Sequence, residues 1–133
     1  MSTSRPLELI HMYFFGPTRV VSLDGMYYAY VLVDDYSTYT WVYFLTHKND
    51  AFKAFENFAK RVKKDKSFCI SSIKSDHGTE FENEFFKTFC NENGISHTFS
   101  SPRSPQQNRV VERKNITLME MARIMLHDYS LPL

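Results

Sequence analysis

Three consecutive segments near the start of the chain are dense in aromatic and β-branched residues, and this feature constrains the fold more than any other. They cover residues 7–15, 27–35 and 39–46, with short polar or turn-forming stretches between them. Residues of these types are enriched in strands. The Gly16–Pro17 pair is expected to end the first strand, and a polar connector follows through Gly25. The pattern therefore predicts three sequential strands in an antiparallel meander.

After the third strand, the apolar residues change to helical spacing. Phe55, Phe58 and Val62 recur at intervals of three and four residues, which predicts an amphipathic helix with its lysines toward solvent. A short strand over 70–76, a second helix that ends at Asn93–Gly94, and a strand over 95–100 are expected next. The element order predicts an α/β domain with a five-stranded mixed sheet flanked by helices.

A last long helix is expected to begin at Ser104. This Ser is a suitable N-cap, Pro105 takes the first helical position, and Gln107 completes a capping box. The apolar stripe of this helix faces the core, and Glu112 lies at its edge. Glu112 is therefore predicted to reach a site beside the sheet.

The composition limits the classes of function. A chain of 133 residues is expected to form one domain, and a formal charge of +1 gives no overall attraction to nucleic acid. The two cysteines, Cys69 and Cys90, have neither zinc-site spacing nor the pattern of a disulfide framework. No signal-peptide pattern or membrane-length apolar run is present. These features predict an intracellular protein with no membrane contact, in which any DNA-binding surface is local.

Two carboxylates are candidates for metal chemistry. Asp76 follows the fourth predicted strand and Glu112 lies on the last helix, so residues 77–111, 35 positions, separate them. Phosphoryl transfer with Mg²⁺ requires carboxylates that converge from separate elements. The spacing alone is weak evidence, because the chain contains 15 acidic residues.

Six ordered motifs give the candidates their context. They are HMYFFGP (11–17), VDDYSTYTWVYFL (33–45), SDHGTEF (75–81), HTFSSPRSPQQN (97–108), VVERKN (110–115) and MARIML (121–126). Together they resemble the integrase core of copia-type LTR retrotransposons. The resemblance implies a ribonuclease-H-like fold that binds two Mg²⁺ or Mn²⁺ ions, processes retroelement ends and joins them to target DNA in the nucleus, as a homo-oligomer.

The same resemblance implies the extent of the domain. Residues 1–133 are expected to form an integrase catalytic core that is cut at both ends. The final helix, the upstream zinc-binding domain and the C-terminal domain of the family are expected to be missing.

In the family pattern, Asp76 takes the place of the second metal-binding carboxylate and Glu112 that of the third, while Tyr13 stands where the first Asp belongs. A phenol has a pKa near ~10 and is neutral at pH 7. Weak or absent metal binding and little strand transfer are therefore expected. Asp34 and Asp35 are not expected to substitute. A hairpin around the loop from Gly16 to Met26 would put Tyr13 near Tyr28 or Tyr30, and Asp34 roughly 15–20 Å away opposite the start of the first strand.

The resemblance also suggests residues that contact DNA. They are Gln107, Asn108, Arg113 and Lys114. Arg109 replaces a family Gly, which is one of several departures that suggest an eroded genomic copy. The alternative function is a non-catalytic nucleic-acid-binding or self-associating remnant. An ordinary ribonuclease-H-like nuclease is disfavoured by the Pro-Gln-Gln-Asn run.

Overall fold

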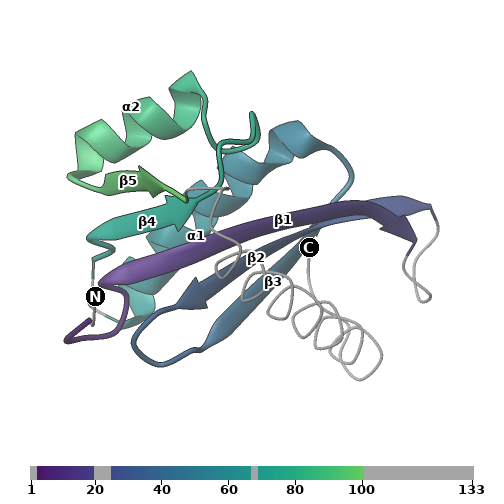
Figure 1. Ribbon diagram of the computed structural model, residues 1–133. Coiled ribbons are helices and arrows are strands. Elements are labelled where there is room, and N and C mark those ends of the chain that lie inside the picture. The colour runs from purple at the N-terminus through teal and green to yellow at the C-terminus, as the bar shows by residue number, and fades with distance from the viewer. Residues whose placement is uncertain (1–2, 20–24, 67–68, 101–133) are drawn as a thin grey trace.

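The computed structural model describes residues 3–19, 25–66 and 69–100 (Figure 1). The elements in chain order are β1 (Leu9–Arg19), β2 (Met26–Asp34), β3 (Thr40–Leu45), a 3₁₀ turn η1 (Lys48–Asp50), α1 (Ala51–Lys66), β4 (Ser72–Ser75), α2 (Glu84–Asn93) and β5 (Ser96–Phe99). Within these residues, the type and order of the elements agree with the sequence-based prediction. The helix predicted from Ser104 lies outside the described residues. No described helix is both long and apolar enough to cross a membrane.

The five strands form one mixed sheet in the order β3-β2-β1-β4-β5. Strands β1, β2 and β3 are antiparallel neighbours, as the meander predicts. Strand β4 pairs with β1 in parallel, and β5 pairs with β4 in parallel. The predicted five-stranded mixed sheet is therefore confirmed, and β1 is its central strand (Figure 1).

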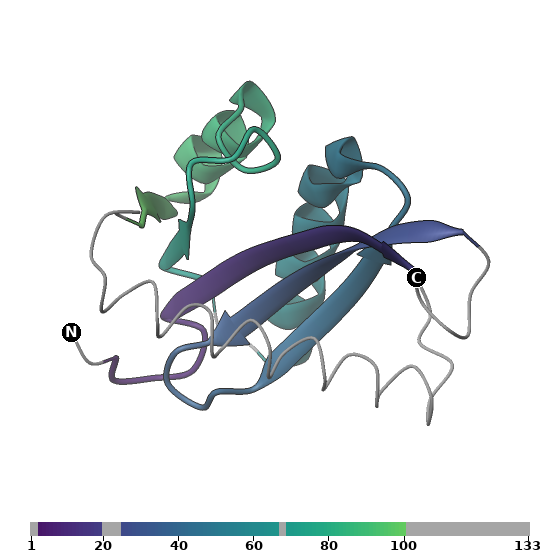
Figure 2. The ribbon, with the colours of Figure 1, turned by 45° about the vertical axis from the view of Figure 1, so that its right-hand side comes forward.

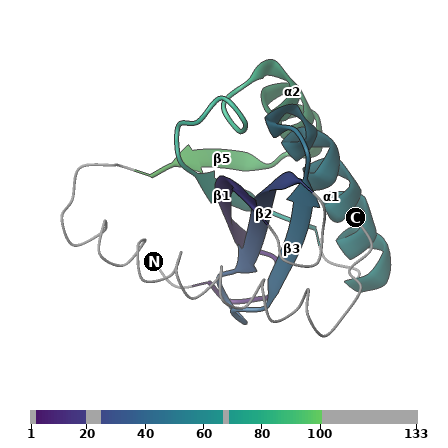
Figure 3. The ribbon, with the colours of Figure 1, turned by 90° about the vertical axis from the view of Figure 1, so that its right-hand side faces the viewer.

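Both described helices pack on the same face of this sheet (Figures 2 and 3). The predicted stripe on α1 supplies Phe55, Phe58 and Val62 to the main core, each at most 3% exposed. Phe86 of α2 packs on Phe55, with 5.3 Å between the ring centroids. Burial of such large aromatic side chains is the main apolar contribution to the stability of this layer. We call this face of the sheet the helix face.

The end of the first strand was predicted wrongly. β1 does not stop at Gly16–Pro17 but continues to Arg19, and its pairing with β2 shifts by one residue between Phe15 and Thr18. Such a bulge admits an unpaired residue and a proline, which has no N–H to donate to the ladder. Gly16 has a φ of 122°, which suits glycine. The Gly16–Pro17 pair, which predicted a turn, therefore lies at a bulge inside a longer strand.

Both ends of α2 are capped, and the C-terminal end was predicted from the sequence. Asn83 is the N-cap, and its side chain accepts a hydrogen bond from the Phe86 N–H at 3.1 Å. Gly94 ends the helix in the left-handed conformation, with a φ of 65°, and its N–H donates to the Cys90 carbonyl. The predicted stop at Asn93–Gly94 is confirmed.

Candidate functional site

Tyr13 lies in the middle of β1, opposite Val31 of β2, on the face of the sheet away from α1 and α2. Alternation along the strand explains this position, because Ile10 and Met12 belong to the main core on the helix face. The Tyr13 ring stacks against Phe15, with 6.3 Å between centroids. We call this second face of the sheet the Tyr13 face.

The Tyr13 hydroxyl is a neutral group. Burial is the larger cause that raises the pKa of this phenol above its ordinary value, and the negative charge of Asp35 raises it further. Both effects disfavour a phenolate. At neutral pH, residue 13 therefore offers a cation an uncharged oxygen at the end of a bulky ring.

Asp76 comes directly after β4, and its side chain is exposed. Strands β1 and β4 pair in parallel. The pairing begins with Leu9 and Ser72 and ends with His11 and Lys74. Continued by two residues, this register brings Tyr13 alongside Asp76, at the usual spacing of about 4.8 Å between neighbouring strands. Laterally paired residues of adjacent strands point to the same face. The pairing itself ends at His11 and Lys74, so the closeness of Tyr13 and Asp76 remains a prediction from the register.

The carboxylate of Asp76 is partly committed to its own turn. Its Oδ1 accepts a hydrogen bond from the Gly78 N–H at 3.0 Å. This is an Asx turn, which fixes the direction of a short acidic side chain. A carboxylate oxygen at a strand end is the kind of ligand that Mg²⁺ takes.

The remaining predicted residues lie outside the described part of the chain. They are Gln107, Asn108, Glu112, Arg113 and Lys114. Within residues 3–19, 25–66 and 69–100, no three His, Cys, Asp or Glu side chains come close enough together to hold a metal ion. A neutral phenol and one carboxylate do not fit a pair of divalent cations, which need several anionic oxygens.

The register predicted between the first two strands was wrong, and with it the predicted distance from Asp34 to Tyr13. Asp34 pairs with Ile10, three residues from Tyr13, so their separation along the strands is about 10 Å and not 15–20 Å. The error follows from the first hairpin, where the strands continue beyond Gly16 and the bulge shifts the pairing. Asp34 has a structural role instead, because its carboxylate accepts hydrogen bonds from the Leu7 N–H and from Ser37.

Asp35 acts on Tyr13 through its charge. Its charge contributes to the raised pKa of Tyr13. The same carboxylate contacts His11 Nε2 at 2.8 Å and accepts a hydrogen bond from the Thr3 hydroxyl at 3.0 Å. Asp35 is therefore held by His11 and Thr3 at the start of β1, and its charge acts on the Tyr13 phenol.

The sequence did not predict a cluster of rings around Ser75 and His77. Phe99 of β5 stacks on His97 with 4.2 Å between centroids, and on His77 with 4.6 Å. The alternation of His97 and Phe99 along one strand could have indicated a shared face. Their position next to Ser75 and His77 depends on the parallel pairing of β4 and β5, which has no local signature in the sequence.

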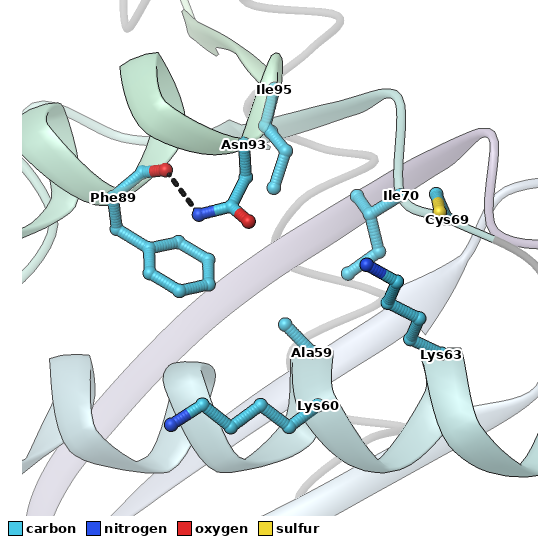
Figure 4. Close-up of a pocket in the computed structure, with 8 residues that line it drawn as sticks. All are labelled: Ala59, Lys60, Lys63, Cys69, Ile70, Phe89, Asn93 and Ile95. Atoms are coloured by element: carbon cyan, nitrogen blue, oxygen red, sulfur yellow. Dashed lines mark hydrogen bonds between the residues drawn. The ribbon is translucent and has the colours of Figure 1, made fainter.

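A pocket of about 300 Å³ lies on the helix face, between α1, α2 and the segment that leads into β4 (Figure 4). Its lining residues are Ala59, Lys60, Lys63, Cys69, Ile70, Phe89, Asn93 and Ile95. None of the predicted site residues is among them. The pocket is therefore separate from the candidate site.

Comparisons with known proteins agree with the motifs. The integrase core domain model matches residues 3–105 of the chain. The Retrovirus-related Pol polyprotein from transposon TNT 1-94 of Nicotiana tabacum is 34% identical over 126 residues, which are 95% of this chain and 10% of that protein. The corresponding polyprotein from transposon RE2 of Arabidopsis thaliana is 31% identical over 132 residues, 99% of this chain and 9% of that protein. The chain thus spans about a tenth of the length of these relatives.

Solved structures show the same fold. A chain of the simian T-cell lymphotropic virus intasome in complex with PP2A regulatory subunit B56 gamma matches with a TM-score of 0.73 and 18% identity, over 100% of this chain and 46% of that one. The catalytic core domain of BIV integrase matches with a TM-score of 0.63 and 20% identity, over 92% of this chain and 74% of that one. The ribonuclease-H-like fold expected from the motifs is confirmed.

Proposed function

Because the chain belongs to the integrase core domain family, we propose that it is the DNA-joining core of a copia-type retrotransposon integrase, in a copy whose metal site lacks one acid. The observation that carries this proposal is the register of β1 and β4, which, continued by two residues, brings Tyr13 alongside Asp76. These two positions match the first and second carboxylates of the family motif. Glu112 is proposed as the third.

In this class of reaction, divalent cations neutralise charge on the phosphoryl group and activate the attacking oxygen. Asp76 supports such chemistry, because it is an exposed carboxylate beside the central strand. Tyr13 opposes it, because its phenol is neutral. We therefore propose that this copy carries out little or no end processing or strand transfer. The proposal implies DNA as the partner and a nuclear location.

Restoring the acid tests the proposal. Tyr13→Asp is expected to bind Mn²⁺ about tenfold or more tightly than the unmodified chain, which corresponds to about 1.4 kcal/mol of added attraction. Isothermal titration calorimetry measures the affinity, and broadening of the amide signals of residues 76–78 by Mn²⁺ locates the ion. Strand-transfer activity on a retroelement-end duplex is a second measurement.

The matched control is Tyr13→Asn, which has the size of Asp without its charge. Both variants remove the bulky ring, so any difference in their Mn²⁺ affinity is due to the negative charge of the carboxylate. If both variants bind Mn²⁺ equally well, or if the broadening falls far from Asp76, the assignment of residue 13 to the metal site is wrong.

A second candidate is a non-catalytic nucleic-acid-binding remnant, and the aromatic residue at position 13 favours it. Such a module needs no cation at Asp76. It is expected to retain DNA in a chelator and to lose affinity steeply as salt rises, because phosphate contacts release counterions. Fluorescence anisotropy with a labelled duplex would show this, and a response that does not depend on salt would exclude it.

A further inference from the structure

The peptide that carries Asp76 is held by a buried serine. Ser75 is 2% exposed, and its Oγ lies 2.8 Å from His97 Nε2 and 3.0 Å from the Asp76 carbonyl oxygen. The Ser75 carbonyl also accepts a hydrogen bond from the Ser100 N–H at 2.7 Å. Residues on or next to β5 thus hold both the backbone and the side chain of Ser75.

The geometry assigns the protons in this group of contacts. A hydroxyl has one hydrogen to donate, and Ser75 donates it to the Asp76 carbonyl. The contact with His97 then requires that Nε2 carries the proton and donates to Ser75 Oγ. A neutral imidazole has one such N–H, and burial, the largest cause, lowers the pKa of His97 and favours this neutral form.

The rings on β5 restrain the segment on the other side of Asp76. Phe99 is stacked between His97 and His77, and the two ring pairs are inclined by 29° and 17°. The Nδ1 of His77 also lies 3.1 Å from a carboxylate oxygen of Glu82. Asp76 is therefore flanked by two residues, Ser75 and His77, whose positions depend on β5.

The direction of the Asp76 side chain follows from this backbone. Ser75 is buried on the helix face, so alternation turns Asp76 toward the Tyr13 face. The Asx turn to Gly78 then sets the rotation of the carboxylate. A shift of the Ser75–Asp76 peptide would move both.

We propose that His97 is a positioning residue for Asp76: through Ser75, its imidazole fixes the peptide from which the Asp76 carboxylate projects toward residue 13. Among the described residues, the hydrogen-bond contact of His97 is with Ser75, so His97 acts on Asp76 through another residue. The inference rests on the proposed function, because the role of Asp76 at the site is what makes its position matter.

Hydrogen exchange of the Gly78 amide tests this proposal, because that N–H donates to the Asp76 carboxylate. His97→Leu removes the donor to Ser75, and exchange at Gly78 is expected to become about tenfold faster. His97→Gln keeps an N–H near the Nε2 position and is expected to remain within about threefold of the unmodified chain. Amides in the middle of β2 serve as the internal reference for global stability.

His47→Leu is the matched control, because His47 is exposed and makes no side-chain cap contact. It should leave Gly78 unchanged. If His97→Leu fails to fold, Ser75→Ala replaces it, and it should also accelerate exchange at Gly78. Adding His97→Gln to Ser75→Ala should have no further effect, since both changes act through one contact.

Two results would overturn the proposal. In the first, His97→Leu accelerates hydrogen exchange of the Gly78 amide by no larger a factor than exchange of the reference amides in β2. In the other, His97→Gln behaves as His97→Leu does, which would leave only a packing role for the ring. These measurements use no metal ion, so they remain informative if the Mn²⁺ titration of Tyr13→Asp contradicts the proposed function.

Discussion

The carboxylate of Asp34 ties the start of β1 to the turn between β2 and β3, and its removal should be among the most damaging single substitutions. The residue is 2% exposed. Its Oδ1 accepts a hydrogen bond from the Leu7 N–H at 2.9 Å, and its Oδ2 accepts from the Ser37 N–H at 3.2 Å and the Ser37 hydroxyl at 2.6 Å. Leu7 has a φ of 65°, so Asp34 holds a residue in an unfavourable conformation.

The magnitude follows from these three contacts. Hydrogen bonds to a charged group contribute about 1.5–3 kcal/mol each, and neighbouring bonds are not additive. Asp34→Ala also leaves the N–H of buried Leu7 without its acceptor. We expect the free energy of unfolding to fall by about 3–5 kcal/mol, out of a total near 5–15 kcal/mol for a domain of this kind.

Urea denaturation followed by circular dichroism measures this loss, which should lower the midpoint by about 2 M for a typical dependence on urea. Asp34→Asn keeps the shape but turns an amide N–H toward one of the donors, so an intermediate loss is expected. Asp65→Ala, at an exposed acid on α1, is the control and should change stability by less than about 0.5 kcal/mol. A loss below about 1 kcal/mol for Asp34→Ala would refute this account of the turn.

Three further predictions follow from the described residues. Cys69 is exposed, whereas burial raises the pKa of Cys90 to about 11, so mass spectrometry should show a thiol reagent modifying Cys69 in the native protein and both cysteines in urea. Gly94→Ala should destabilise the domain by about 1 kcal/mol in urea titrations, because the φ of 65° is unfavourable for Ala although no atom lies within 4 Å of the new methyl group. Burial lowers the folded-state pKa of His97 below 6.5, so the unfolded chain binds the proton first as the pH falls. Stability should therefore decrease as the pH drops through about 6.5, and His97→Gln should weaken this dependence in urea titrations at several pH values.

The elements that the sequence predicted correctly are those with local causes. The spacing of Phe55, Phe58 and Val62 is sufficient to predict a helix with a buried stripe, and α1 has it. Asn93–Gly94 predicts a helix end, because few residues other than glycine adopt a positive φ easily. Such features depend on the chemistry of neighbouring residues, so they can be predicted without knowledge of the strand pairing.

The features that the sequence did not predict correctly depend on register. With the bulge after Phe15, Asp34 pairs with Ile10 and Tyr13 pairs with Val31. This register differs from the predicted one, so the predicted distance between Asp34 and Tyr13 was too long. The contact of His97 with Ser75 requires two parallel strands aligned to the residue, and nothing near either position specifies that alignment. The resemblance predicts that residue 13 departs from the family motif, and the ladder of β1 and β4, continued by two residues, predicts which residue lies beside it. The predicted roles of Glu112 and the DNA-contacting residues stay predictions.

The central strand limits how position 13 can change during evolution. Insertion or deletion of one residue before Tyr13 would exchange the two sides of β1, sending Tyr13 into the apolar layer beneath α1 and exposing Met12. Such a shift of register would place a phenol in the apolar layer and is expected to destabilise the fold strongly. A change at position 13 that preserves the fold is therefore confined to replacement of one side chain within an unaltered strand.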